Sequence, residues 1–332
     1  NFDFFKFLFV NIVIKNIKKS SICKCFMILF YNFKKNFKKQ PTMSVKLSPI
    51  IAGVMNWGVL DKNLNTNEMN HLINLFFENG ITSFDHADIY GGYTTEADFG
   101  KAWAASKLDR NKVQLISKCG IQYVSENRPQ NIVKHYNYSK DYIIWSAENS
   151  LKNLQTDYLD VFLLHRPSPL LQADEVAEAV EKLKYEGKIL SFGVSNFTPF
   201  QTELLRQKTA VSFNQIQFSA TNHEPMLDGS LDYMQLHKIT PMAWNPLGVV
   251  FRENTEQTQR LKLLFSKLVD KYHVGSDLIL LAWILQHPAN ILPVAGTINV
   301  SRIQQLMKAK SLVLDSQDWF AIWTESMGNK VP

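Results

Sequence analysis

The sequence predicts an α/β protein of the (β/α)8, or TIM, barrel class, in which eight parallel strands, each followed by a helix, close into a cylinder. From about Ile50 onward, short apolar runs alternate with longer amphipathic stretches, the pattern of repeated strand-helix units. Seven or eight such units occupy about 270 residues, close to the usual barrel length of about 250. A doubly wound sheet is the main alternative, but no Gly-x-Gly-x-x-Gly fingerprint follows the first strand.

Each unit can be placed in order along the chain. The candidate strands are residues 50–54, 83–85, 113–117, 160–164, 189–194, 213–217, 241–244 and 291–294. The clearest amphipathic helices are residues 66–79, 141–154, 173–186 (with Gly187 as its stop signal) and 301–310. Two long loops, residues 121–140 and 248–256, follow the third and seventh strands. On a barrel both lie at the C-terminal face, where we expect them to shape a substrate pocket.

The first 42 residues differ in composition from the rest of the chain. They hold nine lysines and one aspartate, a net charge of +8, so the whole-chain value of +6 leaves −2 for residues 43–332. The basic excess therefore gives no indication of nucleic-acid binding. We interpret residues 1–42 as a dispensable extension, disordered or non-native, before a functional start at Met43. A targeting or anchoring role is the alternative, although the apolar run at residues 22–31 is too short to span a bilayer.

Cysteine content and hydropathy favour a reducing compartment. Cys23, Cys25 and Cys119 supply neither a disulfide framework nor a zinc site. No stretch of residues 43–332 approaches a transmembrane helix. We therefore predict a cytoplasmic protein, a monomer by default, without membrane or nucleic-acid partners.

Polar side chains follow the predicted strands at their C-terminal ends. They are Asp85 with Tyr90, Lys118, His165, Ser195 with Asn196, Gln215 with Gln217, and Trp244. Each has an ordinary structural explanation when taken singly, because a strand-end lysine often pairs with a carboxylate and a lone histidine is often a hydrogen-bonded core residue. The C-terminal ends of all barrel strands meet on one face, so together these side chains indicate an active site.

Four motifs, in this order and at these spacings, resemble the aldo-keto reductase superfamily. They are Asp85-His86-Ala87-Asp88-Ile89-Tyr90-Gly91, Ile116-Ser117-Lys118, Leu163-Leu164-His165-Arg166-Pro167 and Gly193-Val194-Ser195-Asn196-Phe197. The resemblance covers nearly all of residues 45–332 and is closest to a bacterial-type subgroup. It implies a TIM-barrel oxidoreductase that reduces aldehydes or ketones to alcohols by hydride transfer from a nicotinamide cofactor. It also implies a catalytic tetrad of Asp85, Tyr90, Lys118 and His165.

The chemistry of carbonyl reduction agrees with these four residue types. Hydride delivered to a carbonyl carbon leaves negative charge on the oxygen, so the site needs a proton donor. Tyr90 is the natural acid, and we expect the Lys118 ammonium to lower its pKa from the ordinary value near 10. We expect Asp85 to keep Lys118 charged and in place, and His165 to orient the carbonyl oxygen.

The resemblance also implies the cofactor contacts. Ser195, Asn196 and Gln215 would hydrogen-bond the nicotinamide carboxamide, and Trp244 would stack on its ring. Most of the family has tyrosine where this chain has Trp244, and a buried core aromatic is the structural alternative for that residue. Arg302 could pair with a 2′-phosphate near a helix N-terminus. The remaining expected contacts are Leu247, Gly296, Thr297 and Gln305. Many members carry a lysine near Gly296 that is absent here, so NADP(H) is our first choice and NAD(H) is not excluded.

Two other function classes remain open at this point. Regulatory subunits of channels share this fold and tetrad and bind nucleotide mainly as redox sensors with little turnover. A metal-dependent hydrolase would need convergent histidine and carboxylate ligands, and His86 with Asp85 and Asp88 offers too few.

Overall fold

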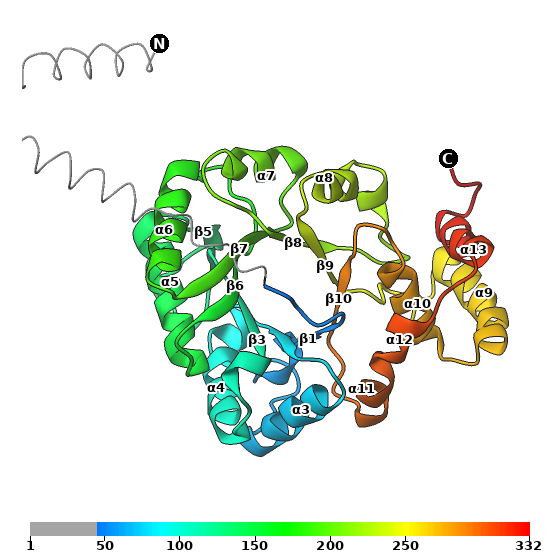
Figure 1. The fold of residues 1–332 in the computed structure, drawn as a ribbon, viewed down its shortest axis with the longest axis horizontal. Helices are drawn as coiled ribbons and strands as arrows, with labels where there is room; N and C mark the ends of the chain where they lie inside the picture. The colour runs from blue at the N-terminus through cyan, green and yellow to red at the C-terminus, as the bar shows by residue number, and fades with distance from the viewer. Residues whose placement is uncertain (1–44) are drawn as a thin grey trace, which may run out of the picture. The chain divides into compact units, whose positions relative to one another are not determined.

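A computed structural model describes residues 45–332, so the prediction for residues 1–42 lies outside the described part. Eight strands close into a barrel. They are β1 (Ile51–Gly53), β2 (Ser83–Asp85), β3 (Gln114–Cys119), β6 (Leu159–Leu164), β7 (Ile189–Ser195), β8 (Phe213–Gln217), β9 (Thr240–Trp244) and β10 (Leu292–Ala295). All neighbours are parallel, in the order β1-β10-β9-β8-β7-β6-β3-β2 (Figure 1). The predicted (β/α)8 barrel is confirmed, and the doubly wound sheet is excluded because the barrel closes.

Helices surround the barrel and connect its strands (Figure 1). They are α3 (Thr66–Glu78), α4 (Thr95–Ser106), α5 (Lys140–Leu154), α6 (Ala173–Tyr185), α7 (Pro199–Arg206), α8 (Ser230–Leu236), α9 (Glu256–Tyr272), α10 (Ser276–Leu285), α11 (Val300–Leu306), α12 (Lys308–Ser311) and α13 (Ser316–Met327). Short 3-10 turns η1 (Met55–Trp57), η2 (Tyr90–Gly92), η3 (Arg110–Lys112) and η4 (Glu224–Met226) complete the set. Helix α10 packs on β10, whereas α9 and α13 pack against each other away from the strands.

Side-chain caps fix where several helices begin. Asn65 caps α3 in a reciprocal capping box with Glu68, and Thr198 caps α7 in the same way with Gln201. The helices predicted at residues 66–79, 141–154 and 173–186 agree with α3, α5 and α6 to within one residue. The helix predicted at residues 301–310 is instead divided into α11 and α12. The division falls at Met307, whose φ of −68° and ψ of −14° keep the right-handed helical turn.

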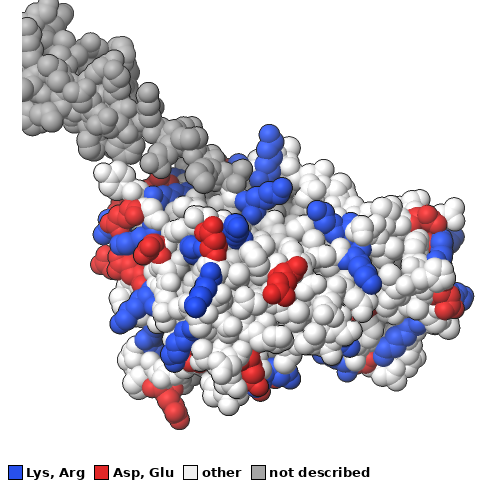
Figure 2. Space-filling model, turned by 60° about the horizontal axis from the view of Figure 1, so that its bottom comes forward, with Lys and Arg blue, Asp and Glu red and all other residues white. Residues whose placement is uncertain are grey.

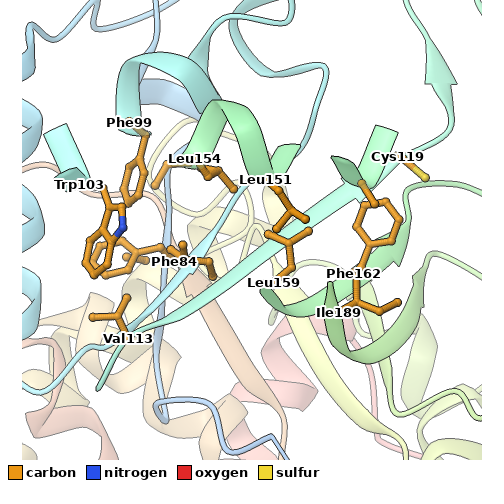
Figure 3. Close-up of a cluster of buried hydrophobic side chains, with 14 of the residues drawn as sticks. Phe84, Phe99, Trp103, Val113, Cys119, Leu151, Leu154, Leu159, Phe162 and Ile189 are labelled. Atoms are coloured by element: carbon orange, nitrogen blue, oxygen red, sulfur yellow. The ribbon is translucent and has the colours of Figure 1, made fainter. Parts of the chain in front are cut away.

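Two apolar layers lie on opposite sides of the barrel wall. Inward-facing residues near the N-terminal ends of the strands fill the interior, among them Ile116, Val161, Phe213 and Met242. Outward-facing residues pack under the surrounding helices. Figure 3 shows part of this outer layer, where Trp103 of α4 lies beside Phe84 of β2, and Leu151 of α5 faces Leu159 of β6.

The two-residue repeat of a β-strand determines which side chains lie at the C-terminal end of the barrel interior. Side chains two residues apart point to the same face of a strand, so each interior apolar residue is followed on the inner face by a residue nearer the C-terminal end. Ile116 is followed by Lys118, Leu163 by His165, Phe213 by Gln215 and Met242 by Trp244. These four side chains therefore project into the same end of the barrel.

The loop at residues 121–140 is more regular than expected. It contains a small antiparallel pair, β4 (Ile121–Gln122) with β5 (His135–Tyr136). Each strand has only two residues, which is too short for alternation to reveal it in the sequence. The other long loop ends as predicted, because α9 begins at Glu256 with Thr255 as its cap.

The surface of the described residues carries both signs of charge. Figure 2 shows acidic and basic side chains interspersed on the face that it presents, rather than gathered by sign. Among the helices of residues 45–332, none is long and apolar enough to cross a bilayer.

Candidate active site

Tyr90 reaches the end of the barrel on a tight turn after β2. The turn η2 is built on left-handed backbone, with φ of 60° at Gly91 and 63° at Gly92. Glycine adopts this conformation at little steric cost. The paired glycines therefore let the chain reverse directly after Tyr90 and continue into α4.

Lys118 connects the other members of the predicted tetrad. Its Nζ lies 2.8 Å from the carboxylate of Asp85, 2.7 Å from the carbonyl oxygen of His86 and 3.1 Å from the hydroxyl of Tyr90. An ammonium group has three N–H donors, and each has a partner here. Lys118 is fully buried, so these bonds hold its charge in one place. Because Nζ donates to the Tyr90 oxygen, the phenol hydrogen has to point elsewhere.

The pKa of Tyr90 differs from our expectation. Burial raises it, and the Lys118 ammonium lowers it, while the Asp85 carboxylate raises it again. The net direction is upward, so the expected lowering by Lys118 is present but outweighed by burial. Tyr90 therefore stays protonated at neutral pH, the form that can give up a proton. Burial alone would lower the pKa of Lys118, but Asp85 and Tyr90 raise it, which keeps Lys118 cationic.

The two histidines of these motifs are both neutral but lie in different surroundings. His165 lines the cavity above the barrel, its ring edge-on to that of Tyr90 with 6.0 Å between centroids. Burial and the Lys118 charge lower its pKa well below the ordinary value. His86 is fully buried against Phe99, with 4.2 Å between ring centroids, and burial lowers its pKa to about 3. His165 can thus face a ligand, whereas His86 offers only its backbone carbonyl to Lys118.

The residues expected to hold the nicotinamide carboxamide are bonded to one another. Gln215 Nε2 donates to Asp85 at 2.9 Å, which leaves its amide oxygen free for a ligand. Trp244 Nε1 donates to Asn196 Oδ1 (3.0 Å), and Asn196 Nδ2 donates to Ser195 Oγ (2.7 Å). Ser195 Oγ in turn donates to the backbone carbonyl oxygen of Gln215 (3.0 Å). Gln215 and Trp244 line the cavity, but Ser195 and Asn196 do not. In this structure Ser195 and Asn196 therefore position the Trp244 ring.

A cavity of about 1220 Å³ opens above these side chains. Typical small-molecule pockets hold about 300–1,000 Å³, so there is room for a ligand as large as a dinucleotide. Leu247, Gly296, Thr297 and Arg302 line it as expected, but Gln305 lies outside. A Cβ at Gly296 would meet nothing nearer than Asn56 Nδ2 at 4.0 Å, so the backbone there is open to a ligand. The open backbone and the exposed Arg302 fit a nicotinamide dinucleotide.

Several residues of the cavity wall were not expected from the sequence. They are Asn56 after β1, Lys134 beside β5, Arg166 after β6, and Asn245 and Arg252 after β9. Arg166 is part of the quoted His-Arg-Pro motif, and Lys134 and Arg252 lie in the two long loops, so their segments were recognised but their individual side chains were not. Among residues 45–332, no three histidine, cysteine or acidic side chains gather in a way that could hold a metal ion.

Comparison with known proteins identifies the family. The sequence profile of the Aldo/keto reductase family matches residues 49–324. The chain belongs to this family. Proteins similar to it include the uncharacterized oxidoreductase YcsN of Bacillus subtilis strain 168, 42% identical over 87% of this chain and 97% of that protein. Another is a 6-dehydroglucose reductase of Agrobacterium fabrum strain C58, 35% identical over 86% of this chain and 97% of that protein.

Among solved structures, an aldo/keto reductase from Klebsiella pneumoniae in complex with NADP and acetate is 25% identical. It covers 83% of this chain and 90% of its own, with a TM-score of 0.69. As an aldo/keto reductase, the protein is a nicotinamide-dependent oxidoreductase that reduces aldehydes or ketones.

Proposed function

We propose that this aldo/keto reductase uses NADP(H) in preference to NAD(H) and that Tyr90 gives the proton to the carbonyl oxygen. One observation carries the second part: the Tyr90 hydroxyl accepts a hydrogen bond from Lys118, which is itself paired with Asp85, at the floor of the cavity. A reduced nicotinamide, when bound, supplies the hydride. The protein's own residues supply the proton and stabilise the oxygen that receives it.

Each tetrad residue has a separate task in this proposal. The Tyr90 phenol, protonated because burial raises its pKa, donates its proton as negative charge develops on the carbonyl oxygen. Lys118 then stabilises the phenolate that remains, at a distance of 3.1 Å. Asp85 neutralises Lys118 in the ground state. His165 is neutral and lines the cavity, so its ring can donate a hydrogen bond to the substrate oxygen without competing as an acid.

Arg302 supports the preference for NADP(H). It is exposed at the cavity wall, and among the described residues its guanidinium has no carboxylate partner. An arginine in this state suits a phosphate group, which it can bind with two hydrogen bonds. Isothermal titration should therefore give a lower Kd for NADPH than for NADH, and Arg302→Ala should reduce that difference. Equal affinity of the unaltered protein for both nucleotides would remove the role assigned to Arg302.

A turnover assay separates this proposal from the redox-sensor alternative. Purified protein with NADPH is offered a panel of aldehydes and ketones, and nicotinamide absorbance is followed. Turnover of any of them supports the enzyme, whereas tight NADPH binding without turnover across the panel would favour the sensor. A monomeric state and a cytoplasmic location stay predictions, of which light scattering tests the first.

A further inference from the structure

Arg166 is a half-buried cation without a partner at the catalytic end of the cavity. Among residues 45–332, no hydrogen bond from its guanidinium and no ion pair is formed, and no carboxylate contributes to its pKa. Arg110, the other partly buried arginine that contacts the barrel strands, binds Asp160 at 2.8 Å and two backbone carbonyls. Buried or partly buried charges in proteins are ordinarily paired. An arginine left unpaired in a cavity is therefore suited to an anion that arrives with the ligand.

The structure holds Arg166 in a fixed position. The Tyr138 hydroxyl donates to the Arg166 carbonyl and accepts from the Arg166 backbone N–H at 3.1 Å. The guanidinium carbon lies 5.4 Å from the centroid of the Trp244 ring, a cation–π contact that orients it. Gly120 makes room for the Tyr138 ring, because a Cβ there would clash with the ring carbons. Such preorganisation lowers the entropy cost of binding a ligand.

Lys134 adds a second cation on the same side. It lines the cavity from the loop that carries β5, and the structure gives it no carboxylate partner within the described residues. Arg166 and Lys134 both lie near enough to lower the pKa of His165, and Arg166 also acts on Tyr90. The three acidic side chains of the cavity wall do not neutralise them. Asp85 is bound to Lys118 and Asp61 to Lys62, while Asp277 accepts from backbone at the start of α10.

We infer that the carbonyl substrate of this enzyme carries an anionic oxygen group, a carboxylate or a phosphate, that binds to Arg166 and Lys134 beside the tetrad. The inference rests on the proposed function, since it names a property of the molecule that Tyr90 protonates. Arg302 lies on α11, among the residues assigned to the nucleotide, whereas Arg166 directly follows His165. The cationic pair therefore belongs to the substrate side of the cavity.

Matched pairs of substrates test the inference. Succinic semialdehyde is compared with butanal for a carboxylate, and D-glyceraldehyde 3-phosphate with D-glyceraldehyde for a phosphate. We expect the anionic member of at least one pair to have a kcat/KM roughly tenfold to a hundredfold higher, as for hydrogen bonds to charged groups. The pair with the higher ratio of anionic to neutral kcat/KM shows whether the group is a carboxylate or a phosphate. The preference should also weaken as NaCl is added, because Lys134 is exposed.

Variants that remove a positive charge test whether Arg166 and Lys134 cause the preference for the anionic substrate. Arg166→Gln and Lys134→Gln should each lower the ratio of anionic to neutral kcat/KM, and Arg166→Lys should restore part of it. Lys134 is exposed, so its variant stays informative even if Arg166→Gln does not fold. Lys112→Gln is the matched control. It removes one positive charge at an exposed position before the N-terminal end of β3, whereas the cavity lies at the C-terminal ends of the strands, so the ratio of anionic to neutral kcat/KM should be unchanged.

The possible failures are distinguishable. If neither pair nor any other aldehyde or ketone of the panel is turned over, the proposed function fails. If other panel members are turned over but neither anionic compound is, the function stands and this inference is wrong. If neutral and anionic members are turned over equally, the function stands and this inference is wrong. If Arg166→Gln weakens NADPH binding as much as it lowers kcat/KM for the anionic substrate, Arg166 serves the nucleotide and the inference is also wrong.

Discussion

Proton donation depends on one hydroxyl group, that of Tyr90. Its removal leaves the cavity wall and the Lys118–Asp85 pair in place. We therefore expect Tyr90→Phe to lower kcat for carbonyl reduction at least about a hundredfold, the usual contribution of a general acid, while NADPH still binds. The measurement is steady-state turnover together with isothermal titration of NADPH. Tyr185→Phe, on an almost fully exposed tyrosine of α6, is the control and should match the unaltered protein.

The raised pKa of Tyr90 gives the two directions of the reaction different pH profiles. Reduction uses the phenol and alcohol oxidation uses the phenolate. Because burial raises the Tyr90 pKa above its ordinary value of 10.0, we expect kcat for reduction to stay level from about pH 6 to about pH 9. We expect kcat for oxidation to increase by roughly tenfold per pH unit over that range. An oxidation rate that levels off near neutral pH would contradict the direction of the shift.

His86 makes the folded state sensitive to acid. Its pKa is about 3 in the folded protein, against 6.5 ordinarily. As pH falls below 6.5 the unfolded chain takes up a proton that the folded protein does not, so stability is lost through this window. At pH 5 the loss is about 2 kcal/mol. We expect His86→Leu to gain about that much stability relative to the unaltered protein between pH 8 and pH 5, measured by urea unfolding. The exposed His71→Gln should show no such pH-dependent difference.

At the scale of single elements, two glycines with left-handed backbone should respond differently to alanine. Gly80, after α3, has φ of 78° and nothing within 4 Å of the position that a Cβ would take, whereas Gly120, after β3, has φ of 109° and a Cβ there would strike the Tyr138 ring. Gly80→Ala should cost about 1 kcal/mol for the backbone alone. Gly120→Ala should cost more by at least about 1 kcal/mol because it adds overpacking. Thermal unfolding of both variants tests this, and equal losses would mean that Tyr138 moves aside freely.

The strands and the tetrad residues could be predicted from the sequence, whereas the contacts between them could not. Strand positions were predictable because each barrel strand is buried on both faces and reads as a short apolar run ended by polar residues. The four tetrad residues were identified through motifs, and their shared location followed from the parallel order of the strands. The contact between Gln215 and Asp85 was not predictable, since it joins residues 130 positions apart across the barrel interior. Periodicity shows the face on which a side chain lies, but not its partner across the interior.

The Tyr90 pKa was predicted in the wrong direction for a related reason. The motif indicates that Lys118 is near, but the loss of solvent around the phenol depends on the surrounding residues of several loops. The β4–β5 pair was likewise missed because its two-residue strands carry no period. Both features depend on packing between segments that are distant in sequence.

For the whole molecule, the barrel closes within residues 45–332. All the residues proposed for catalysis and cofactor binding lie inside that range. We therefore expect a chain that starts at Met43 to keep its thermal midpoint within about 2 °C and its kcat/KM within about twofold. Unfolding scans and turnover of both chains, side by side, provide the measurement. A marked loss in the shorter chain would show that residues 1–42 contribute to the native protein.

The order of the strands divides the rim of the barrel into two arcs. Asp85, Lys118 and His165 come from β2, β3 and β6, which are consecutive neighbours. The residues proposed for the nucleotide come from β7, β8, β9 and β10, which complete the circle back to β1. Among the described residues, the side-chain hydrogen bond from Gln215 to Asp85 is the one that joins the two proposed sets. We therefore expect that exchanging the loop after β3 will alter substrate range while nucleotide preference is kept, because that loop lies on the arc of the tetrad.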